Sequence, residues 1–320
     1  MIPPDLCVLA MGGNSLIDPR GALDVAHQFD ITRQAIAPIA ALMARGVPLV
    51  LTHGNGPQVG FMQLRSELAR GTLHEVPLDS LVADSQGSLG YMLQLTLRES
   101  LEEHGRSMEV ISVVTEVEVD PDDPAMTHPT KPIGRFYSQE EAQQLASERG
   151  WRMVEDSRRG YRRVVPSPKP HRILQLDIIK RLVESGVMVI ACGGGGIPVV
   201  ARDGHHRGLE AVIDKDHASA LLAAGLGARR LIITTGIDTI FKDYLTDHPT
   251  PLPRTDVAEL SALHAAGQFP PGSMGPKVEA AIHFLEAGGE EVLICRPERL
   301  LEAVDGLTGT RIVRKLPRSS

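Results

Sequence analysis

The chain has 320 residues, enough to bury a large core, and its 33 basic and 40 acidic residues give a net charge of −7. One Trp, four Tyr and six Phe make it poor in aromatic residues. Because it offers neither a general positive field nor a platform for stacking bases, we expect no binding to nucleic acid or to a membrane surface.

Short apolar runs alternate with helical patterns along most of the chain. In chain order, they predict a strand at 6–11, a helix at 25–45, a strand at 47–52, a helix at 78–104, a strand at 110–119, a helix at 173–185, a strand at 187–192, a helix at 216–224, a strand at 231–235, a helix at 277–287 and a strand at 291–295. Strands that are apolar on both faces and alternate with helices predict a mainly parallel open sheet covered on both sides. The expected fold is a three-layer αβα sandwich.

Capping residues are predicted at two of these helices. Asp79 stands at the start of the helix at 78–104, which Gly105 ends, and Asp216 stands at the start of the helix at 216–224.

One segment interrupts the alternation of strands and helices. Residues 120–170 contain seven prolines, which suit stiff loops and hairpin edges better than a central sheet. We therefore interpret residues 122–166 as a small protruding subdomain inserted within one domain that spans 1–320.

Three cysteines bear on the cellular compartment. Cys7, Cys192 and Cys295 are odd in number and far apart, each in or beside an apolar run, which indicates reduced core residues and not disulfides or a metal cage. No apolar run reaches the ~18 residues of a membrane span, and no basic leader precedes the first apolar stretch. We expect a cytoplasmic protein without membrane contact.

Glycine clusters follow several of the predicted strands. The usual signatures of dinucleotide binding, P-loops, α/β hydrolases, redox dithiols and zinc proteases are missing. Instead, glycines stand at strand ends in Gly12-Gly13-Asn14-Ser15, Gly54-Asn55-Gly56, residues 193–196 and Gly236. One such cluster alone is better explained as a tight turn. Four at the carboxyl ends of parallel strands favour a cradle of backbone N–H groups for phosphoryl groups.

Lysines in small-residue or proline-rich surroundings suit phosphoryl transfer, which needs positioned positive charge more than covalent chemistry. Lys215 stands between Asp214 and Asp216, and Lys277 follows a turn that contains Gly275. The two aspartates either orient lysines or help to hold Mg²⁺. Two further lysines, Lys131 and Lys169, lie between prolines. For Lys169, a role in the site and a role as a surface solubiliser both remain open.

Other polar residues are weaker candidates. His53 precedes the second glycine loop and is either a substrate contact or a hydrogen-bonded loop residue. His205 and His206 indicate an exposed hairpin and not a metal site. A basic run is either a solvated face or an aid to binding anionic ligands; it comprises Arg158, Arg159, Arg162 and Arg163.

Six segments between residues 10 and 310 lie in an order that is typical of one known family. They are Thr-His-Gly-Asn-Gly-Pro-Gln-Val-Gly at 52–60, Asp-Pro at 120–121 with Pro-Thr-Lys-Pro-Ile-Gly at 129–134, Arg-Val-Val-Pro-Ser-Pro-Lys-Pro at 163–170, and residues 192–200, 210–216 and 271–277. Together they resemble carbamate kinase, a member of the amino-acid-kinase superfamily. Ala10 stands where many members of the superfamily carry a lysine, and in this it is similar to carbamate kinases.

The resemblance implies an open αβα sandwich, a homodimer and a protruding subdomain that covers the substrate. It implies Mg²⁺-dependent, reversible phosphoryl transfer between ATP and carbamate, which gives ADP and carbamoyl phosphate. It also implies a place in arginine metabolism and no dedicated metal ligands in the protein. The catalytic residues it implies are Lys131, Lys215, Asp216 and Lys277. The small-substrate residues are Gly12, Gly13, Asn14, Gly54 and Asn55, and the nucleotide residues are Asp214, Gly236, Asp238, Gly275 and Lys277.

Two alternatives remain beside this function. The first is a kinase of the same fold that acts on another small acid or phosphate. A lysine at position 10 and absence of the Pro-Thr-Lys-Pro loop would favour it, but position 10 is alanine and the loop is present. A catalytically silent regulatory protein on the same scaffold predicts loss of Lys215 or Lys277, and both are present.

Overall fold

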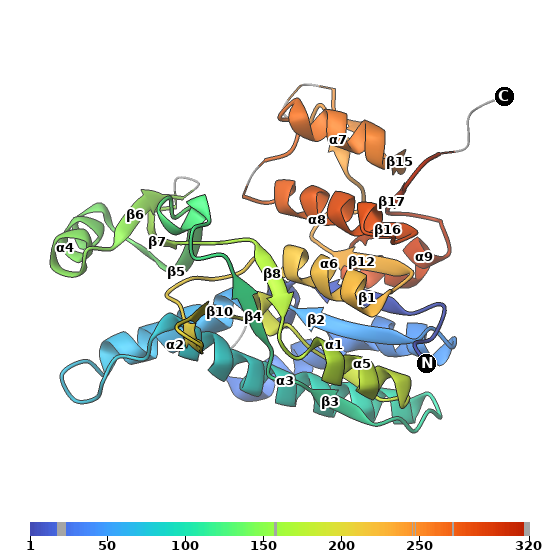
Figure 1. The fold of residues 1–320 in the computed structure, drawn as a ribbon, viewed down its shortest axis with the longest axis horizontal. Helices are drawn as coiled ribbons and strands as arrows, with labels where there is room; N and C mark the ends of the chain where they lie inside the picture. Colours follow the sequence, from blue (N-terminus) through green and yellow to red (C-terminus); the bar gives the residue numbers. More distant parts are fainter. Residues whose placement is uncertain (18–23, 157–158, 245, 247, 271, 317–320) are drawn as a thin grey trace.

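A computed structural model describes residues 1–17, 24–156, 159–244, 246, 248–270 and 272–316 (Figure 1). An eight-stranded sheet forms its centre, in the order β15-β17-β16-β12-β1-β2-β9-β3. Neighbouring strands are parallel except for β16 and β17. The strands, in chain order, are β1 (Cys7–Met11), β2 (Leu49–His53), β3 (Val110–Ser112), β9 (Met188–Ile190), β12 (Arg230–Thr234), β15 (Arg254–Asp256), β16 (Glu291–Cys295) and β17 (Thr310–Val313).

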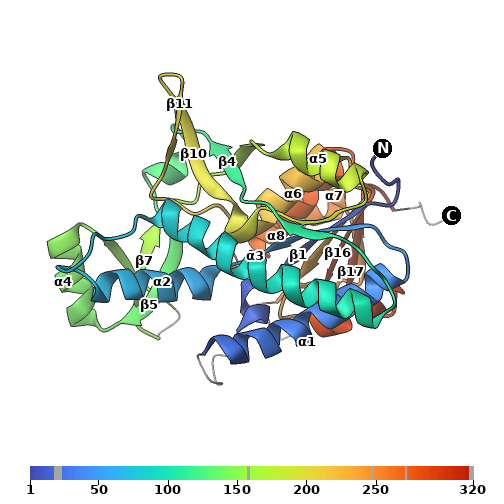
Figure 2. The ribbon, with the colours of Figure 1, turned by 90° about the horizontal axis from the view of Figure 1, so that it is seen from below.

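Helices cover both faces of this sheet, so the predicted three-layer αβα sandwich is confirmed (Figure 2). One face packs against α1 (Val25–Ala44), α3 (Leu78–Glu103) and α9 (Leu300–Val304). The other packs against α5 (Leu176–Glu184), α6 (Lys215–Leu226), α7 (Val257–Ala265) and α8 (Gly275–Glu286). Further short 3-10 turns are η1 (Gly13–Leu16), η2 (Pro124–Met126), η3 (Gly193–Gly195) and η4 (Pro297–Arg299).

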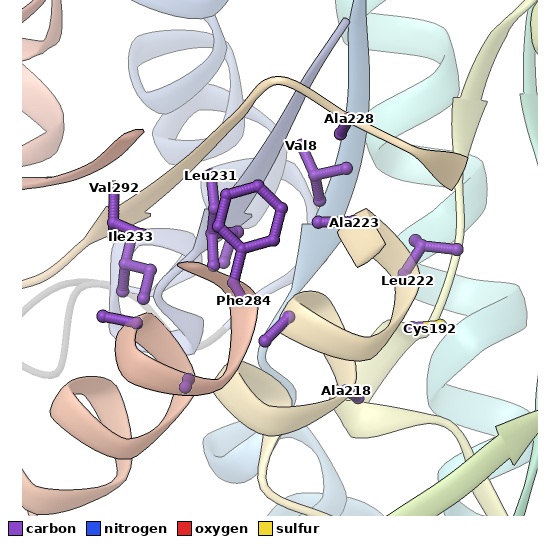
Figure 3. Close-up of a cluster of buried hydrophobic side chains, with 14 of the residues drawn as sticks. Val8, Cys192, Ala218, Leu222, Ala223, Ala228, Leu231, Ile233, Phe284 and Val292 are labelled. Carbon is purple, nitrogen blue, oxygen red and sulfur yellow. The ribbon is translucent and has the colours of Figure 1, made fainter. Parts of the chain in front are cut away.

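The central strand β1 shows why both faces must be covered. Its side chains alternate between the two cores, with Val8 and Ala10 on the side of α6 and α8 and with Leu9 and Met11 on the side of α1 and α3. All five residues of β1 are buried. Figure 3 shows Phe284 of α8 against Val8 and Leu231 in the first of these cores.

Two smaller sheets lie beside the main one. A four-stranded sheet has the order β11-β10-β4-β8, and a three-stranded sheet has the order β5-β7-β6. Their strands are β4 (Glu116–Val119), β8 (Pro170–Ile173), β10 (Ile197–Arg202) and β11 (His205–Gly208), and β5 (Lys131–Tyr137), β6 (Arg152–Glu155) and β7 (Tyr161–Val165); a two-stranded ribbon joins β13 (Phe241–Lys242) to β14 (Thr250–Pro251). His205 and His206 lie in the hairpin of β10 and β11, as expected.

The three-stranded sheet and α4 (Gln139–Arg149) form a unit that stands away from the main sheet (Figure 1). We call residues 131–165 of this unit the projecting unit. Its helix begins with a complete capping box between Ser138 and Glu141 and ends at Gly150 in the left-handed conformation. The unit contacts the body through α2 (Gly56–Leu68), which packs against β5.

Several predicted boundaries were wrong. The strand expected at 110–119 is two strands in different sheets, β3 and β4, and the helix expected at 173–185 begins after β8. Helix α3 has Pro77 at its N-cap position, and Asp79 lies within its first turn. Helix α6 is capped by Asp214, whose side chain accepts the N–H of Asp216, so Asp216 is left for other partners.

The three cysteines are free and buried, as the sequence indicated. Burial raises the pKa of each thiol to about 12, so these thiols stay protonated near neutral pH. Within the residues that the structure describes, no helix has the length and apolar character needed to span a bilayer.

Candidate active site

The carboxyl ends of β12, β1 and β2 open onto one cavity of about 610 Å³. The strands are parallel neighbours, so the loops that follow them meet at one edge of the sheet. Ten predicted site residues line this cavity: Gly12, Gly13, Gly54, Asn55, Lys131, Asp214, Lys215, Asp216, Gly236 and Lys277.

The first two glycine loops lie in direct contact. A Cβ atom added to Gly54 would lie 2.7 Å from the backbone nitrogen of Gly13, and one added to Gly13 would lie 3.0 Å from the carbonyl carbon of Gly54. A side chain would collide with backbone at Gly54 and would be tightly crowded at Gly13, so glycine at both positions lets the two loops approach closely.

A third glycine loop closes on Asn55. Gly194 has φ +67°, and a Cβ atom there would lie 2.0 Å from Asn55 Nδ2. The same amide nitrogen donates to Ser85 Oγ at 2.8 Å. Asn55 is also the N-cap residue of α2 and makes no side-chain cap there, so its side chain is held across the cavity wall while the first turn of α2 stays open toward the cavity.

One buried carboxylate holds two lysines together. Asp216 Oδ1 lies 2.5 Å from Lys215 Nζ, and Oδ2 lies 3.1 Å from Lys277 Nζ. Burial opposes ionisation of Asp216, but the two ammonium groups outweigh it and keep its pKa below the ordinary range. The carboxylate therefore stays charged, and the lysines of α6 and α8 point to the same place.

A second ion pair joins the projecting unit to the body. Lys131 Nζ of β5 lies 2.6 Å from Asp214 Oδ2, while Asp214 Oδ1 accepts the backbone N–H of Asp216 at 2.9 Å. Burial disfavours the charged form of Asp214, but the nearby Lys131 ammonium prevails, so the pKa of this carboxyl is well below its usual value. Three lysines and two aspartates thus contribute one excess positive charge to the cavity, and the charges of the other two ionisable lining residues, Arg296 and Glu298, cancel.

The nucleotide-side residues are placed less directly. Gly236 lines the cavity, whereas Asp238 and Gly275 are not among the lining residues. Asp238 lies 3.4 Å from Arg296 Nε, and Arg296 does line the cavity. Arg296 and Thr234 were not predicted as site residues. Each lies at the carboxyl end of a predicted strand, so the argument that placed the glycine loops at the ligand edge would also have selected them.

Several candidates lie elsewhere or outside the described residues. His53, the last residue of β2, is buried, its Nδ1 lies 3.1 Å from Gly54 O, and burial lowers its pKa to about 4, which agrees with a neutral, hydrogen-bonded residue at the strand end. Lys169 is exposed and pairs with Glu279 at 3.6 Å. Arg158, Pro271 and the side chain of Asn14 lie outside the described part of the structure.

The carboxylates near the cavity do not form a ready magnesium site. Both oxygens of Asp216 and both of Asp214 already accept hydrogen bonds from lysines or from backbone N–H groups. Among the described residues, no group of three or more His, Cys, Asp or Glu side chains is arranged to hold a metal ion. What the cavity offers is backbone N–H groups and ammonium groups, which bind phosphate oxygens.

Known proteins are similar to this chain over nearly its full length. The model of the amino acid kinase family matches residues 5–296. A carbamate kinase of Pyrococcus furiosus is 44% identical over 96% of this chain and 98% of its own. The carbamate kinase-like protein YahI of Escherichia coli is 44% identical over 97% and 99%. A carbamate kinase from Giardia lamblia bound to AMP-PNP superposes with a TM-score of 0.89 at 38% identity, over 97% of this chain and 98% of that one.

Proposed function

The chain belongs to the amino acid kinase family, in which its relatives are carbamate kinases, and we propose that it transfers a phosphoryl group reversibly between ATP and carbamate. The observation that carries the proposal is the pair Lys215 and Lys277, held by Asp216 at the edge where the glycine loops meet. In one direction carbamoyl phosphate and ADP give carbamate and ATP, and in the other carbamate and ATP give carbamoyl phosphate and ADP.

The lysine pair stabilises the charge that spreads over the moving phosphoryl group. Asp216 lies behind both ammonium groups and offsets their mutual repulsion, so they are positioned before substrate arrives. Such preorganised charge is the main catalytic contribution in phosphoryl transfer. Lys215 and Lys277 act as catalytic residues in this proposal, and Asp216 acts as a positioning residue.

The glycine loops bind the small substrate and the phosphoryl group. The N–H of Gly13 and the first turn of α2 lie at the end of the cavity near Asn55. Gly12 and Gly54 shape the loops there, because their own N–H groups donate to Thr234 Oγ1 at 3.4 Å and to Met11 O at 3.0 Å. Gly236 and Arg296 line another part of the wall, after β12 and β16, and suit the nucleotide. Asn14, Asp238 and Gly275 remain proposed contacts from the family resemblance.

Lys131 brings a third charge from the projecting unit. Its partner Asp214 competes with any anionic substrate for the ammonium group, and we propose that substrate binding draws Lys131 toward the transferring oxygens. The projecting unit, and the wider segment 122–166, would then cover the substrate.

No general base is needed. Carbamate is an anion at neutral pH, so its attacking oxygen carries no proton, and the transfer involves no proton on either side. The buried, neutral His53 agrees with a site that has no acid–base pair.

Further features of the proposal rest on the family likeness. Mg²⁺ enters with the nucleotide as part of the substrate, because the aspartates of this chain are occupied by lysines. A homodimer, a cytoplasmic location and a place in arginine metabolism are proposed on the same basis. The three free, buried cysteines support the cytoplasmic location.

The test is an assay of ATP formation from carbamoyl phosphate and ADP with Mg²⁺, in which luciferase luminescence measures the ATP. We expect sustained ATP formation; none from fresh substrate would refute the function. Lys131→Ala should lower kcat by about tenfold or more, because one of the three charges is lost. Lys180→Ala, on the exposed side of α5, is the matched control and should keep the original rate. If both variants turn over alike, Lys131 does not act on substrate.

A further inference from the structure

A second cavity, of about 560 Å³, lies between the body and the projecting unit, and none of its lining residues is shared with the first cavity. One wall comes from α2 and the start of α3, and includes Glu67 and Leu78. The opposite wall comes from the end of α4 and from β6 and β7, and includes Trp151 and Arg163. Its volume is within the range of small-molecule sites.

The wall of the projecting unit carries partly unpaired positive charge. Arg149 and Arg163 lie with their guanidinium carbons 4.7 Å and 4.5 Å from the centre of the Trp151 indole, and their side chains are only 10% and 17% exposed. In the described part of the chain, Arg163 donates to one side chain only, Glu210, at 3.1 Å. Arg152 is exposed and makes no ion pair with any described residue.

These guanidinium groups have little dedicated counter-charge. The only carboxylate beside Arg149 in the described structure is Glu75, 3.3 Å away, and Glu75 also pairs with Arg70 at 3.1 Å. The carboxylate of Glu210 is likewise divided, because its other oxygen accepts the backbone N–H of Leu78 at 2.8 Å. Arg149 Nε and Nη1 are buried without a hydrogen-bond partner in the described structure. Unpaired buried guanidinium nitrogens are costly, and an anionic group in the cavity would offset the positive charge of this wall.

The body wall carries the opposite charge. The hydrogen-bond partners of Glu67 in the described residues are neutral, Gln63 Nε2 at 3.0 Å and the hydroxyl of Tyr137 at 3.4 Å. No described cation forms an ion pair with Glu67. A ligand with only a negative charge would be repelled by the Glu67 carboxylate, and a ligand with only a positive charge would be repelled by the arginines. A ligand that carries both charges satisfies both walls.

We propose that this cavity binds a small zwitterion, a free α-amino acid, with its carboxylate on Arg163 and Arg152 and its ammonium group on Glu67. Val76, Leu81 and the Trp151 ring supply apolar surface for its side chain. Such a ligand would connect the body to the projecting unit at a site separate from the kinase chemistry. The proposal does not rest on the proposed function.

The chain offers a direct probe, because Trp151 is its only tryptophan. The standard L-α-amino acids are titrated one at a time into the full chain, without nucleotide or carbamoyl phosphate. Binding is followed by tryptophan fluorescence and by calorimetry. We expect saturable binding of at least one amino acid. No heat and no fluorescence change with any of them would overturn the proposal and leave the kinase function untouched.

Charge-deleted ligands and variants test the assignment of the two walls. The N-acetyl and carboxamide forms of the bound amino acid should each bind about tenfold or more weakly, because each leaves one charged wall unpaired. Equal binding of either form would refute the zwitterion class.

Arg163→Gln and Glu67→Gln should each raise Kd about tenfold or more. Arg207→Gln, an exposed change on β11 away from the cavity, should not alter Kd. Unchanged binding in both cavity variants would place the ligand elsewhere. The two variants change opposite walls, so a folding defect in one, seen as a lowered melting temperature without ligand, leaves the other to decide.

Discussion

The contact between Gly13 and Gly54 gives the sharpest steric prediction. In Gly54→Ala, the new methyl group lies 2.7 Å from the backbone nitrogen of Gly13 and 3.1 Å from its Cα. Ordinary contact begins near 3.4 Å, so the two loops must separate by several tenths of an ångström. Both neighbours are backbone atoms and cannot rotate away.

The cost follows from these distances. Overpacking of this kind costs about 1–3 kcal/mol. With an unfolding entropy of about 2.1 cal/mol/K per residue, the whole chain has about 0.67 kcal/mol/K, and the melting temperature should fall by about 1.5–4.5 °C. Displacement of the phosphate-binding loops should lower kcat more strongly, by about tenfold to a hundredfold, because transfer depends on alignment.

Gly87→Ala is the matched control. Gly87 is exposed in α3 and does not line the active-site cavity, and a Cβ atom there meets nothing within 4 Å. Alanine at this helical position should leave kcat unchanged and raise stability by up to about 1 kcal/mol. For both variants, calorimetry measures the melting temperature and the rate of ATP formation gives kcat. Equal behaviour of the two alanine variants would refute the steric argument.

Two further predictions concern buried ionisable groups. Asp216→Asn removes the carboxylate that holds Lys215 and Lys277 and should lower kcat by about a hundredfold; turnover within a factor of two of the original would contradict its positioning role. His53 has a folded pKa of about 4, lowered by burial, against about 6.5 when unfolded. The unfolded chain therefore binds more protons between these values, and about 3 kcal/mol of stability present above pH 6.5 is lost as the pH falls to 4. In His53→Gln, urea unfolding should depend less on pH across this window, and an identical dependence would count against the assignment.

The sheet and its ligand edge were predictable because their signals are local. Apolar runs such as residues 291–295 specify buried strands directly, and the glycines at 12–13 and 54 mark the strand ends where loops must approach closely. The parallel order then follows from alternation with helices. This was enough to expect Lys215 near the glycine loops.

What the sequence could not give depends on contacts between distant residues. Asp216 looked like a helix cap, but Asp214 takes that place and leaves Asp216 to hold Lys277, 61 residues away. The pairing of Lys131 with Asp214 likewise needs the position of the projecting unit. The apolar start of residues 110–119 gives way to the alternating Glu-Val-Glu-Val at 116–119, but the pairing of β4 with β8 and β10 depends on residues far along the chain.

The central claim is that two lysines held by one aspartate act on the phosphoryl group during its transfer. It is tested most directly by the single-turnover rate of ATP formation from bound ADP and carbamoyl phosphate, which excludes product release. The account predicts a loss of about a hundredfold or more in Lys277→Ala, while Lys180→Ala keeps the original rate. A Lys277→Ala enzyme that transfers the group at the original rate would contradict it.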